Sequence, residues 1–369
     1  MGGSTNQKQL SVIQFILSIS LALIVFLWSL DLMTSSFQVI GNETVIKVLS
    51  ITSNPFISLF IGLFITAVIQ SSSTSTSLIV AIVASGGLSL ENAVPMIMGA
   101  NIGTTLTSTI VSLSYITDNR EFKNAIATGV MHDFFNILTV IILFPLEYYY
   151  NILSRLSISV ASVFNLSPST DLVKSKSGSS LFESINTFLI DFVDYKILLV
   201  IVACISLFAS IKIISKIISN RMIGASKERF QDVFFKNRLK SFGLGTVLTA
   251  GIQSSSITTS IIVPLGATGK IHPDKIFPYI VGANIGTTIT ALIAAFNKSE
   301  AALSIALVHF LFNLIGTIIF LLIPYLNKVP IRYARQFGLM TSQYRMIGFF
   351  YILFVFFILP LALIFIYKL

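Results

Sequence analysis

The sequence predicts an all-α polytopic membrane protein made of two inverted repeats, each with a re-entrant hairpin and an unwound transmembrane helix. Three observations support this prediction: the composition, an internal repeat, and the placement of basic residues between apolar segments. Of the 369 residues, 54% are hydrophobic and 11% are charged, whereas a soluble domain carries about 25% charged residues. This composition excludes a soluble enzyme and a disordered protein. A single cysteine excludes an internal disulfide framework.

The internal repeat is defined by two motifs that recur without a gap between them. QSSSTSTS at residues 70–77 recurs as QSSSITTS at residues 253–260, and GANIGTT at residues 99–105 recurs at residues 282–288, so both are offset by 183 residues. A third motif, HDFFN at residues 132–136, resembles HFLFN at an offset of 177 residues. Self-similarity at one offset predicts two copies of one structural unit, each about ninety residues long.

The loop charges predict that the two copies are inverted in the membrane. Residues 211–240 hold eight Lys or Arg and two acidic residues, whereas residues 145–195 hold three basic and five acidic residues. Basic loops lie on the cytoplasmic side, so the first segment is expected inside and the second outside. The net charge of +9 therefore reflects membrane topology and not nucleic-acid binding. We expect a multi-pass protein of the cell (inner) membrane with a cytoplasmic N-terminus and an external C-terminus.

Apolar stretches and their interruptions predict the elements in order. Residues 56–69 extend over only about 21 Å as a helix, less than the roughly 30 Å of a hydrocarbon core. With residues 77–85 they predict a re-entrant hairpin whose QSSS tip stops near mid-membrane and lines a polar site. Two glycines in GANIGTT predict an unwound helix over residues 93–113, which would add a second binding element. Spanning helices are expected at residues 12–30, 125–144, 196–218 and 346–367.

Six segments follow from these elements. They are residues 1–53 with the first transmembrane helix, 54–144 as repeat 1, 145–195 as an external connector, 196–236 as a transmembrane helix with a basic cytoplasmic segment, 237–325 as repeat 2, and 326–369 as a cytoplasmic loop with the last transmembrane helix. Within the connector, residues 167–180 are rich in Ser and Lys and are expected to be mobile. Residues 152–164 and 181–193 have helical apolar periodicity and are expected along the interface.

The motifs bring hydroxyls and amides to one region and contain no Lys or Arg. Half-helix N-termini and hydroxyls can hold an anion there, and hydroxyl and carbonyl oxygens can coordinate Na⁺. Two structural readings compete with a binding role. Ser and Thr hydroxyls often bond back to the i−4 carbonyl, and Gly-x-x-x-Gly pairs often pack helices closely. The recurrence of both motifs at one offset favours a binding site.

Asp133 is the one carboxylate well inside a predicted spanning segment. An ionisable residue at that depth is a functional hypothesis by default, so a cation ligand or proton carrier is expected. The alternative is an ion pair with the neighbouring His132. His132 and Asn136, like His309 and Asn313, are spaced to lie on one helical face. The motifs of zinc sites, Walker loops and catalytic triads are missing from the sequence, so an enzyme is not expected.

These motifs resemble the type II sodium/phosphate cotransporters over nearly the whole chain, from about residue 30 to residue 360. The duplicated QSSS is the most specific mark of the resemblance. Many members of that family have Ser where Ala100 and Ala283 stand, which implies a remodelled sodium site here. The connector lacks the cysteines of the animal members and the C-terminal tail is shorter, which implies a bacterial-type protein.

The resemblance implies Na⁺-driven transport of inorganic phosphate by alternating access, in a lipid bilayer, with no cofactor beyond the coupling ion and no nucleic-acid partner. A homodimer is left open. The phosphate-binding set expected from the motifs and the resemblance is Gln70, Ser71, Ser72, Ser73, Asn101, Thr104, Gln253, Ser254, Ser255, Ser256, Asn284 and Thr287. The sodium-binding set is Thr74, Thr105, Thr109, Asp118, Asp133, Asn136, Thr258, Thr288, Thr290 and Asn313.

Three other functions stay open from the sequence. The substrate could be another oxyanion or a dicarboxylate, because hydroxyls do not recognise phosphate alone. The flux could be phosphate efflux. An anion channel or sensor could use the same hydroxyls without coupling to Na⁺. Asp133 and the duplicated site favour coupled transport.

Overall fold

The computed structural model describes residues 54–73, 75–76, 79, 83, 88–163, 182–193, 235, 237–252, 254–295 and 300–367, with scattered positions between 14 and 36 and between 198 and 213. Every regular element in this part of the chain is a helix. Four helices in it are long and apolar enough to cross a membrane: Leu90–Leu113, Asn119–Tyr150, Leu303–Leu322 and Met346–Ile366. The protein is an all-α membrane protein, as the composition predicts.

The first half of the chain contains α2 (Pro55–Ile69), α4 (Leu90–Gly103), α5 (Leu106–Leu113), α6 (Asn119–Tyr150), α7 (Ile152–Val163) and α8 (Glu183–Phe192). The second half contains α11 (Arg238–Ile252), α12 (Ser255–Ala267), α13 (Pro273–Ala295), α14 (Glu300–Thr317) and α15 (Lys328–Gln343). A π-helical turn, η1 (Ile318–Leu322), extends α14. The last helix consists of α16 (Met346–Leu353), the π-turn η2 (Phe354–Ile358) and α17 (Leu359–Ile366).

The bounds of α2 and α11 differ by the same 183 residues as the motifs. Asn54 starts α2 by accepting a hydrogen bond from the amide of Phe56, and Asn237 accepts one from the amide of Lys240 at the start of α11. Each helix has 15 residues, about 22 Å at the helical rise and too short to span a bilayer. Both lie where the first arms of the hairpins are expected, and α12 follows α11 where the second arm of the second hairpin is expected.

The glycines of GANIGTT pack helices together. α2 lies along α4, and α11 lies along α13. A Cβ atom on Gly99 would lie 1.9 Å from the carbonyl oxygen of Leu59 on α2, and one on Gly282 would lie 2.1 Å from that of Phe242 on α11. Gly62 and Gly245 make the reciprocal approaches from α2 and α11. Small residues on both partners let the backbones touch, as in membrane helix pairs.

The expected unwinding of these two helices is wrong. α13 runs through its copy of GANIGTT without a break. In the first copy, α4 and α5 are separated only by Thr104 and Thr105, whose φ and ψ angles stay right-handed helical. The amide of Thr105 bonds the carbonyl of Ile102, so the break is one tight turn. Close packing against α2 and α11 accounts for the glycines, because a side chain would collide there.

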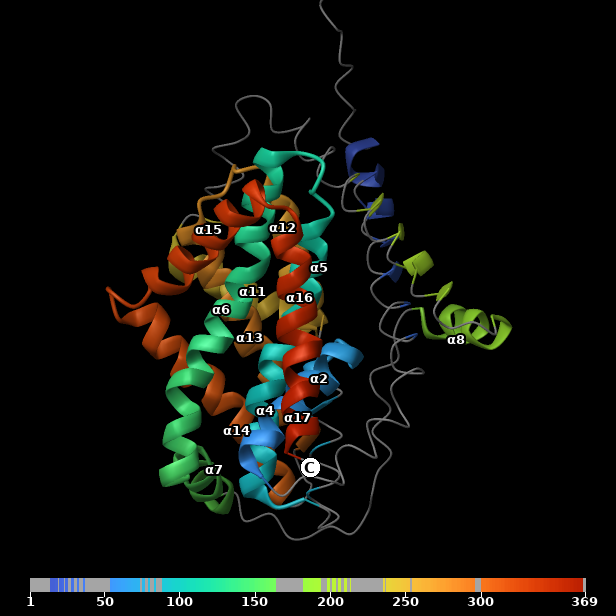
Figure 1. Cartoon of the computed structure of the whole chain (residues 1–369). Coiled ribbons are helices and arrows are strands. Elements are labelled where there is room, and N and C mark those ends of the chain that lie inside the picture. Colours follow the sequence, from blue (N-terminus) through green and yellow to red (C-terminus); the bar gives the residue numbers. More distant parts are fainter. Residues whose placement is uncertain are drawn as a thin grey trace, which may run out of the picture.

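The two halves interlock through the helices that follow each repeat. α7, from the first half, packs on α14, whereas α15, from the second half, packs on α6. α12 packs on α5 and α6. Figure 1 shows α7 and α15 at opposite ends of the helical body, with α12 and α5 together near the end that carries α15. Each half therefore supplies a helix that packs on the long helix of the other half, α7 on α14 and α15 on α6.

The last helix lies at the outside of this body. Only 11% of the apolar stretch in Met346–Ile366 is buried inside the protein, compared with 94% of that in Leu90–Leu113. Figure 1 shows α16 and α17 as one continuous rod along the length of the body. A helix that is apolar all round and exposed on its outer side is suited to face lipid.

Helices α7 and α8 occupy the stretches in which the connector's apolar periodicity predicts them. The segment 167–180, expected to be mobile, lies outside the described residues, as does most of the predicted spans 12–30 and 196–218.

Candidate functional site

A buried network of amides and imidazoles joins the two halves at their GANIGTT motifs. The Nε2 atom of His132 on α6 lies 2.5 Å from Oδ1 of Asn284 on α13. The Nδ2 atom of Asn284 donates to Oδ1 of Asn136 at 2.9 Å. Because the amide of Asn284 is oriented by this second bond, its Oδ1 is an acceptor and His132 is the donor through Nε2. His132 and Asn136 thus both bond the asparagine of the second GANIGTT motif.

A related set of contacts, with the bond between the two asparagines in the opposite direction, surrounds the first motif. His309 on α14 lies 3.2 Å from Oδ1 of Asn101 on α4, and Nδ2 of Asn313 donates to that oxygen at 3.0 Å. The two sets cross between halves, so the His-x-x-x-Asn face of each repeat binds the asparagine of the other. Nδ2 of Asn136 also donates to the carbonyl oxygen of Asn101 at 2.5 Å. All six side chains of the network are at most 3% exposed.

The two QSSS motifs meet beside this network. Ser256, in the first turn of α12, has its Oγ 3.0 Å from Oγ1 of Thr104 and 3.4 Å from the carbonyl oxygen of Gln70. Gln70 ends α2 in the left-handed conformation with φ of 56°. Its side chain is buried, with Oε1 accepting from Thr107 and Nε2 without a partner among the described residues. Residues of the two QSSS motifs therefore meet beside Thr104, in the tight turn between α4 and α5.

The start of α12 supplies positive potential at this junction. Ser254 is the N-cap of α12 and accepts a hydrogen bond from the amide of Ile257. Ser255 and Ser256 follow it and are 2% and 6% exposed. A helix N-terminus presents free amide groups and a partial positive charge to an anion. With the unpaired Nε2 of Gln70, the junction offers buried donors without a basic side chain.

Asp133 is fully buried one residue further along α6 and faces a different group of helices. Its carboxylate accepts a hydrogen bond from the Thr109 hydroxyl, at 2.9 Å to Oδ2 and 3.1 Å to Oδ1. The hydroxyl of Tyr351 on α16 donates to Oδ2 at 2.9 Å. The alternative of an ion pair with His132 is wrong, because His132 bonds Asn284. Among the described residues the one ion pair joins His272 and Asp274.

Besides Thr109, four threonines of the expected sites bond to main-chain carbonyls close before them in sequence. Each hydroxyl donates to the carbonyl oxygen of the residue three or four positions earlier. The four donors are Thr105, Thr258, Thr287 and Thr288. This is the back-bonding that competes with a binding role in membrane helices. A hydroxyl used in this way still has oxygen lone pairs, which a cation can use but an anion cannot.

The remaining expected residues are distributed unevenly. Ser72 is buried, whereas Ser71 and Ser73 on either side of it are half-buried. Asp118 lies apart from the buried cluster: it is exposed and caps α6, accepting bonds from the amides of Arg120 and Glu121. The side chains of Thr74, Gln253 and Thr290 lie outside the described residues.

Sequence reasoning missed Tyr351. It is the one polar side chain in the sequence of Met346–Ile366. That contrast with its apolar surroundings was the available signal.

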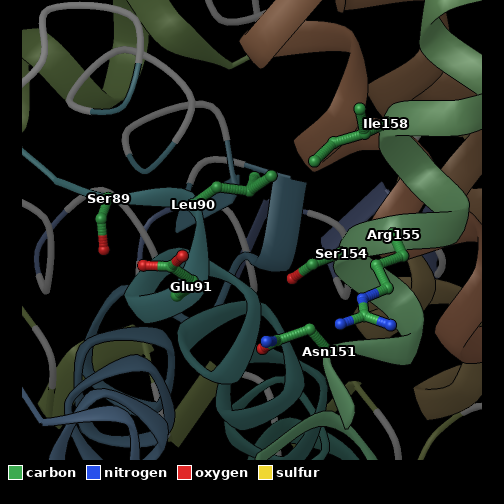
Figure 2. A pocket seen from close by; sticks show the side chains of 7 residues that line it. All are labelled: Ser89, Leu90, Glu91, Asn151, Ser154, Arg155 and Ile158. Atoms are coloured by element: carbon green, nitrogen blue, oxygen red, sulfur yellow. The ribbon is translucent and has the colours of Figure 1, made fainter.

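A cavity of about 380 Å³ lies away from this buried cluster, between the start of α4 and α7. Figure 2 shows Glu91 of α4 on one side of it and Arg155 of α7 on the other. The carboxylate of Glu147 binds the start of α7 nearby, accepting from the amides of Leu153 and Ser154 and from the Ser154 hydroxyl. These donors at the start of α7 stabilise the negative charge of Glu147, and the bonds anchor α7 at the end of α6.

Comparison with known proteins matches the chain to one family over most of its length. The profile of a family described as Na⁺/Pi-cotransporter matches residues 25–164 and 189–361. Sodium-dependent phosphate transport protein 2B of Pongo abelii is 30% identical over 91% of this chain and 63% of its own length. Sodium-dependent phosphate transport protein 2A of Mus musculus is 31% identical over 92% of this chain and 65% of its own length.

The chain thus spans less than two thirds of the length of these curated relatives. No solved structure was found to match it.

Proposed function

The chain belongs to the Na⁺/Pi-cotransporter family, and from this premise we propose that it is a sodium-coupled symporter of inorganic phosphate. The family is one of transporters and not of enzymes. In our proposal both repeats form one substrate site and expose it alternately to the two sides of the membrane. The basic loops support placing α15 and the start of α6 on the cytoplasmic side.

The observation that carries the proposal is the contact between the two QSSS motifs beside Thr104. Ser256 of the second tip reaches both Thr104 and the carbonyl of Gln70. Phosphate would take donors from both tips there: the free Nε2 of Gln70, the serine hydroxyls, and the amides that start α12. An anion held by neutral donors needs a counter-charge, and co-bound Na⁺ supplies one without a basic residue.

The sodium site we propose is centred on Asp133. Its carboxylate is buried and is met by hydroxyls, which are hard oxygen ligands of the kind that alkali and alkaline-earth cations prefer. Thr105 and Thr109 precede it on the adjoining turn and helix, and their lone pairs complete an oxygen-rich environment. A fixed negative charge in a low-dielectric region favours a cation strongly.

The inversion of the repeats is part of the same proposal. The crossed network is related by near-constant offsets, and α7 and α15 lie at opposite ends of the body (Figure 1). An in-plane pseudo-twofold axis through the Asn101 and Asn284 region accounts for both features. In secondary transporters such an axis lets one site be reached from either side.

Uptake of radiolabelled phosphate into liposomes tests the proposal. An inward Na⁺ gradient should drive phosphate accumulation, and an equal gradient of choline should not. Sulfate and a dicarboxylate such as succinate, offered in excess, separate phosphate from other anions by competition. Phosphate equilibration that ignores the cation would indicate a channel and would contradict symport.

Reversal of the gradient is the control for the direction of flux. Liposomes loaded with phosphate and NaCl should release phosphate when external Na⁺ is replaced by choline, because a coupled carrier runs both ways.

The exchange of Gln70 for Ala should reduce uptake severalfold, and a matched exchange of the exposed Gln336 on α15 for Ala should not change it. Equal uptake by the two variants would remove the hairpin tip from the site.

A further inference from the structure

Tyr351 connects a helix outside both repeats to the buried carboxylate. It lies on α16, which follows repeat 2 and faces outward along much of its length. Its hydroxyl donates to Oδ2 of Asp133 at 2.9 Å, a contact between residues 218 positions apart. A phenol aimed from a lipid-facing helix at a buried carboxylate requires an explanation beyond packing, because phenylalanine would fill the same space.

The ring of Tyr351 is held by its neighbours. Its centroid lies 4.7 Å from that of Phe337 on α15 and 6.1 Å from that of Phe356 in η2, the latter edge to face. Aromatic contacts of this geometry fix a ring in place. The hydroxyl is therefore presented to Asp133 at a set position, and rotation about the C–O bond is its main remaining freedom.

The carboxylate of Asp133 is surrounded by hydroxyl groups. The hydroxyls of Thr109 and Tyr351 donate to it, the Thr105 side chain is a further partner, and the single proton of Thr109 is shared between both carboxylate oxygens. The Tyr351 proton occupies an acceptor site of Oδ2 that a cation would also use. A cation that binds Oδ2 competes for the lone pairs that accept the Tyr351 proton. The phenol must then turn its proton away, which leaves a phenolic lone pair toward the cation.

We propose that Tyr351 is a positioning residue that sets the sodium affinity of Asp133 and reports its occupancy to the last helix. The hydroxyl holds the carboxylate while no cation is bound, and cation binding releases it. This inference rests on the proposed sodium site at Asp133. It extends that site to α16, which neither repeat contains.

The π-turn η2 gives the last helix a place to respond. It begins at Phe354, three residues after Tyr351, and it contains Phe356, which packs against the Tyr351 ring. Single π-turns inside α-helices are frequent at functional sites, because their wider hydrogen-bonding pattern allows the register to adjust. A change at the Tyr351 hydroxyl therefore reaches the least regular turn of this helix directly.

The test is Tyr351→Phe, which keeps the ring and removes the hydroxyl. Without the competing hydrogen bond, Na⁺ should bind more tightly, and the Na⁺ concentration for half-maximal phosphate uptake should fall about tenfold, the low end for a bond to a charged acceptor. Tyr344→Phe is the matched control, because that tyrosine ends α15 and is 68% exposed. It should leave the Na⁺ dependence unchanged.

Two further measurements separate positioning from packing. In the Asp133→Asn background, Tyr351→Phe should have no added effect on Na⁺ dependence, since the charge for which the Tyr351 hydroxyl competes with Na⁺ is already gone. In detergent without phosphate, NaCl should raise the unfolding temperature over choline chloride, and more so in Tyr351→Phe than in the wild type. This second readout does not require transport.

The outcomes are distinct. Equal Na⁺ dependence of Tyr351→Phe and the wild type, in uptake and in thermal shift, overturns the inference while symport stands. A tenfold shift that persists in the Asp133→Asn background also overturns it, because the tyrosine would then act by packing. If the wild type shows no Na⁺-driven uptake but Tyr351→Phe enlarges the Na⁺ thermal shift, the inference holds and symport fails.

Discussion

At the residue scale, two adjacent side chains on α6 serve opposite partners. His132 points toward Asn284 on α13, whereas Asp133 points toward Thr109 on α5 and Tyr351 on α16. Consecutive residues of an α-helix are about 100° apart around its axis, so neighbours in sequence do not share a face. The imidazole belongs to the amide network between the halves, and the carboxylate belongs to a separate hydroxyl cluster. Removing one should therefore leave the other intact.

The Asp133→Asn exchange tests the charge of that cluster. Asparagine keeps an acceptor for Thr109 and Tyr351, so the fold and phosphate transport should persist. The neutral amide no longer favours a nearby Na⁺, so one positive charge per phosphate should be lost and uptake should become less sensitive to voltage. One charge crossing the membrane is worth about 2.3 kcal/mol per 100 mV. Current and radiolabelled phosphate flux measured on the same liposomes give the ratio.

His132→Gln is a control for Asp133→Asn, because it alters the adjacent residue and leaves the carboxylate in place. Its charge-to-phosphate ratio should equal that of the wild type. An unchanged ratio in Asp133→Asn would assign Asp133 a structural role and would remove it from the sodium site.

The amide network should contribute to stability equally from both sides. Asn284→Ala removes the side-chain partner of His132 Nε2 and of Asn136 Oδ1, and Asn101→Ala removes that of His309 Nε2, whereas Asn313 Nδ2 keeps its bond to the carbonyl of His309. A buried polar group that loses its partner costs about 1 to 3 kcal/mol. Both variants should lower the unfolding temperature in detergent by similar amounts, whereas the exposed Asn119→Ala should have a smaller effect. A large effect from one motif alone would argue against a symmetric network.

At the element scale, close contact of glycine-bearing helices explains why the motif helices stay wound. Two glycines at i and i+4 are equally suited to an unwound site and to a packing face, so the sequence does not distinguish them. The packed neighbour distinguishes the two roles, because carbonyl oxygens of α2 and α11 lie directly against these glycines. The short hairpin arms, by contrast, were predictable, because their length and polar tips are properties of the segment itself. The position of the tight turn at Thr104 required the structure.

Two glycines of α11 provide a matched test of this packing. Ala at Gly245 would place its Cβ 2.0 Å from the carbonyl oxygen of Tyr279, whereas Ala at Gly243 would meet no atom within 4 Å. Overpacking of this kind costs about 1 to 3 kcal/mol, and Gly to Ala in an open helix position contributes about 1 kcal/mol of helix stability. Gly245→Ala should lower the unfolding temperature and Gly243→Ala should hold or raise it, as followed by circular dichroism. Equal behaviour of the two would exclude close packing of α11 on α13.

At the scale of the whole molecule, the two halves cannot form the site separately. The side-chain hydrogen bonds that join each His-x-x-x-Asn face to the asparagine of the other repeat, and the contact of Ser256 with Thr104, run from one half to the other. The constant offset of the motifs predicts two related units and the meeting of their tips. It does not predict that α7 packs on α14 and α15 on α6, or that α16 reaches Asp133, because these helices lie outside the repeated motifs. Such contacts depend on tertiary packing between segments that share no sequence pattern.

A cross-link between the tips tests whether the halves move apart during transport. Cysteines at Thr104 and Ser256, with Cys204 replaced by Ala, put thiols at oxygen positions 3.0 Å apart. Oxidation should form a disulfide there, because its geometry needs close side chains. If alternating access separates the tips, the oxidised double variant should lose phosphate uptake and reduction should restore it. Each single cysteine variant should show the same uptake under both conditions, which controls for direct effects of the oxidant. Unchanged uptake by fully cross-linked protein would mean that the tips travel as one unit, and the moving boundary would then lie elsewhere, between this joined core and the helices around it.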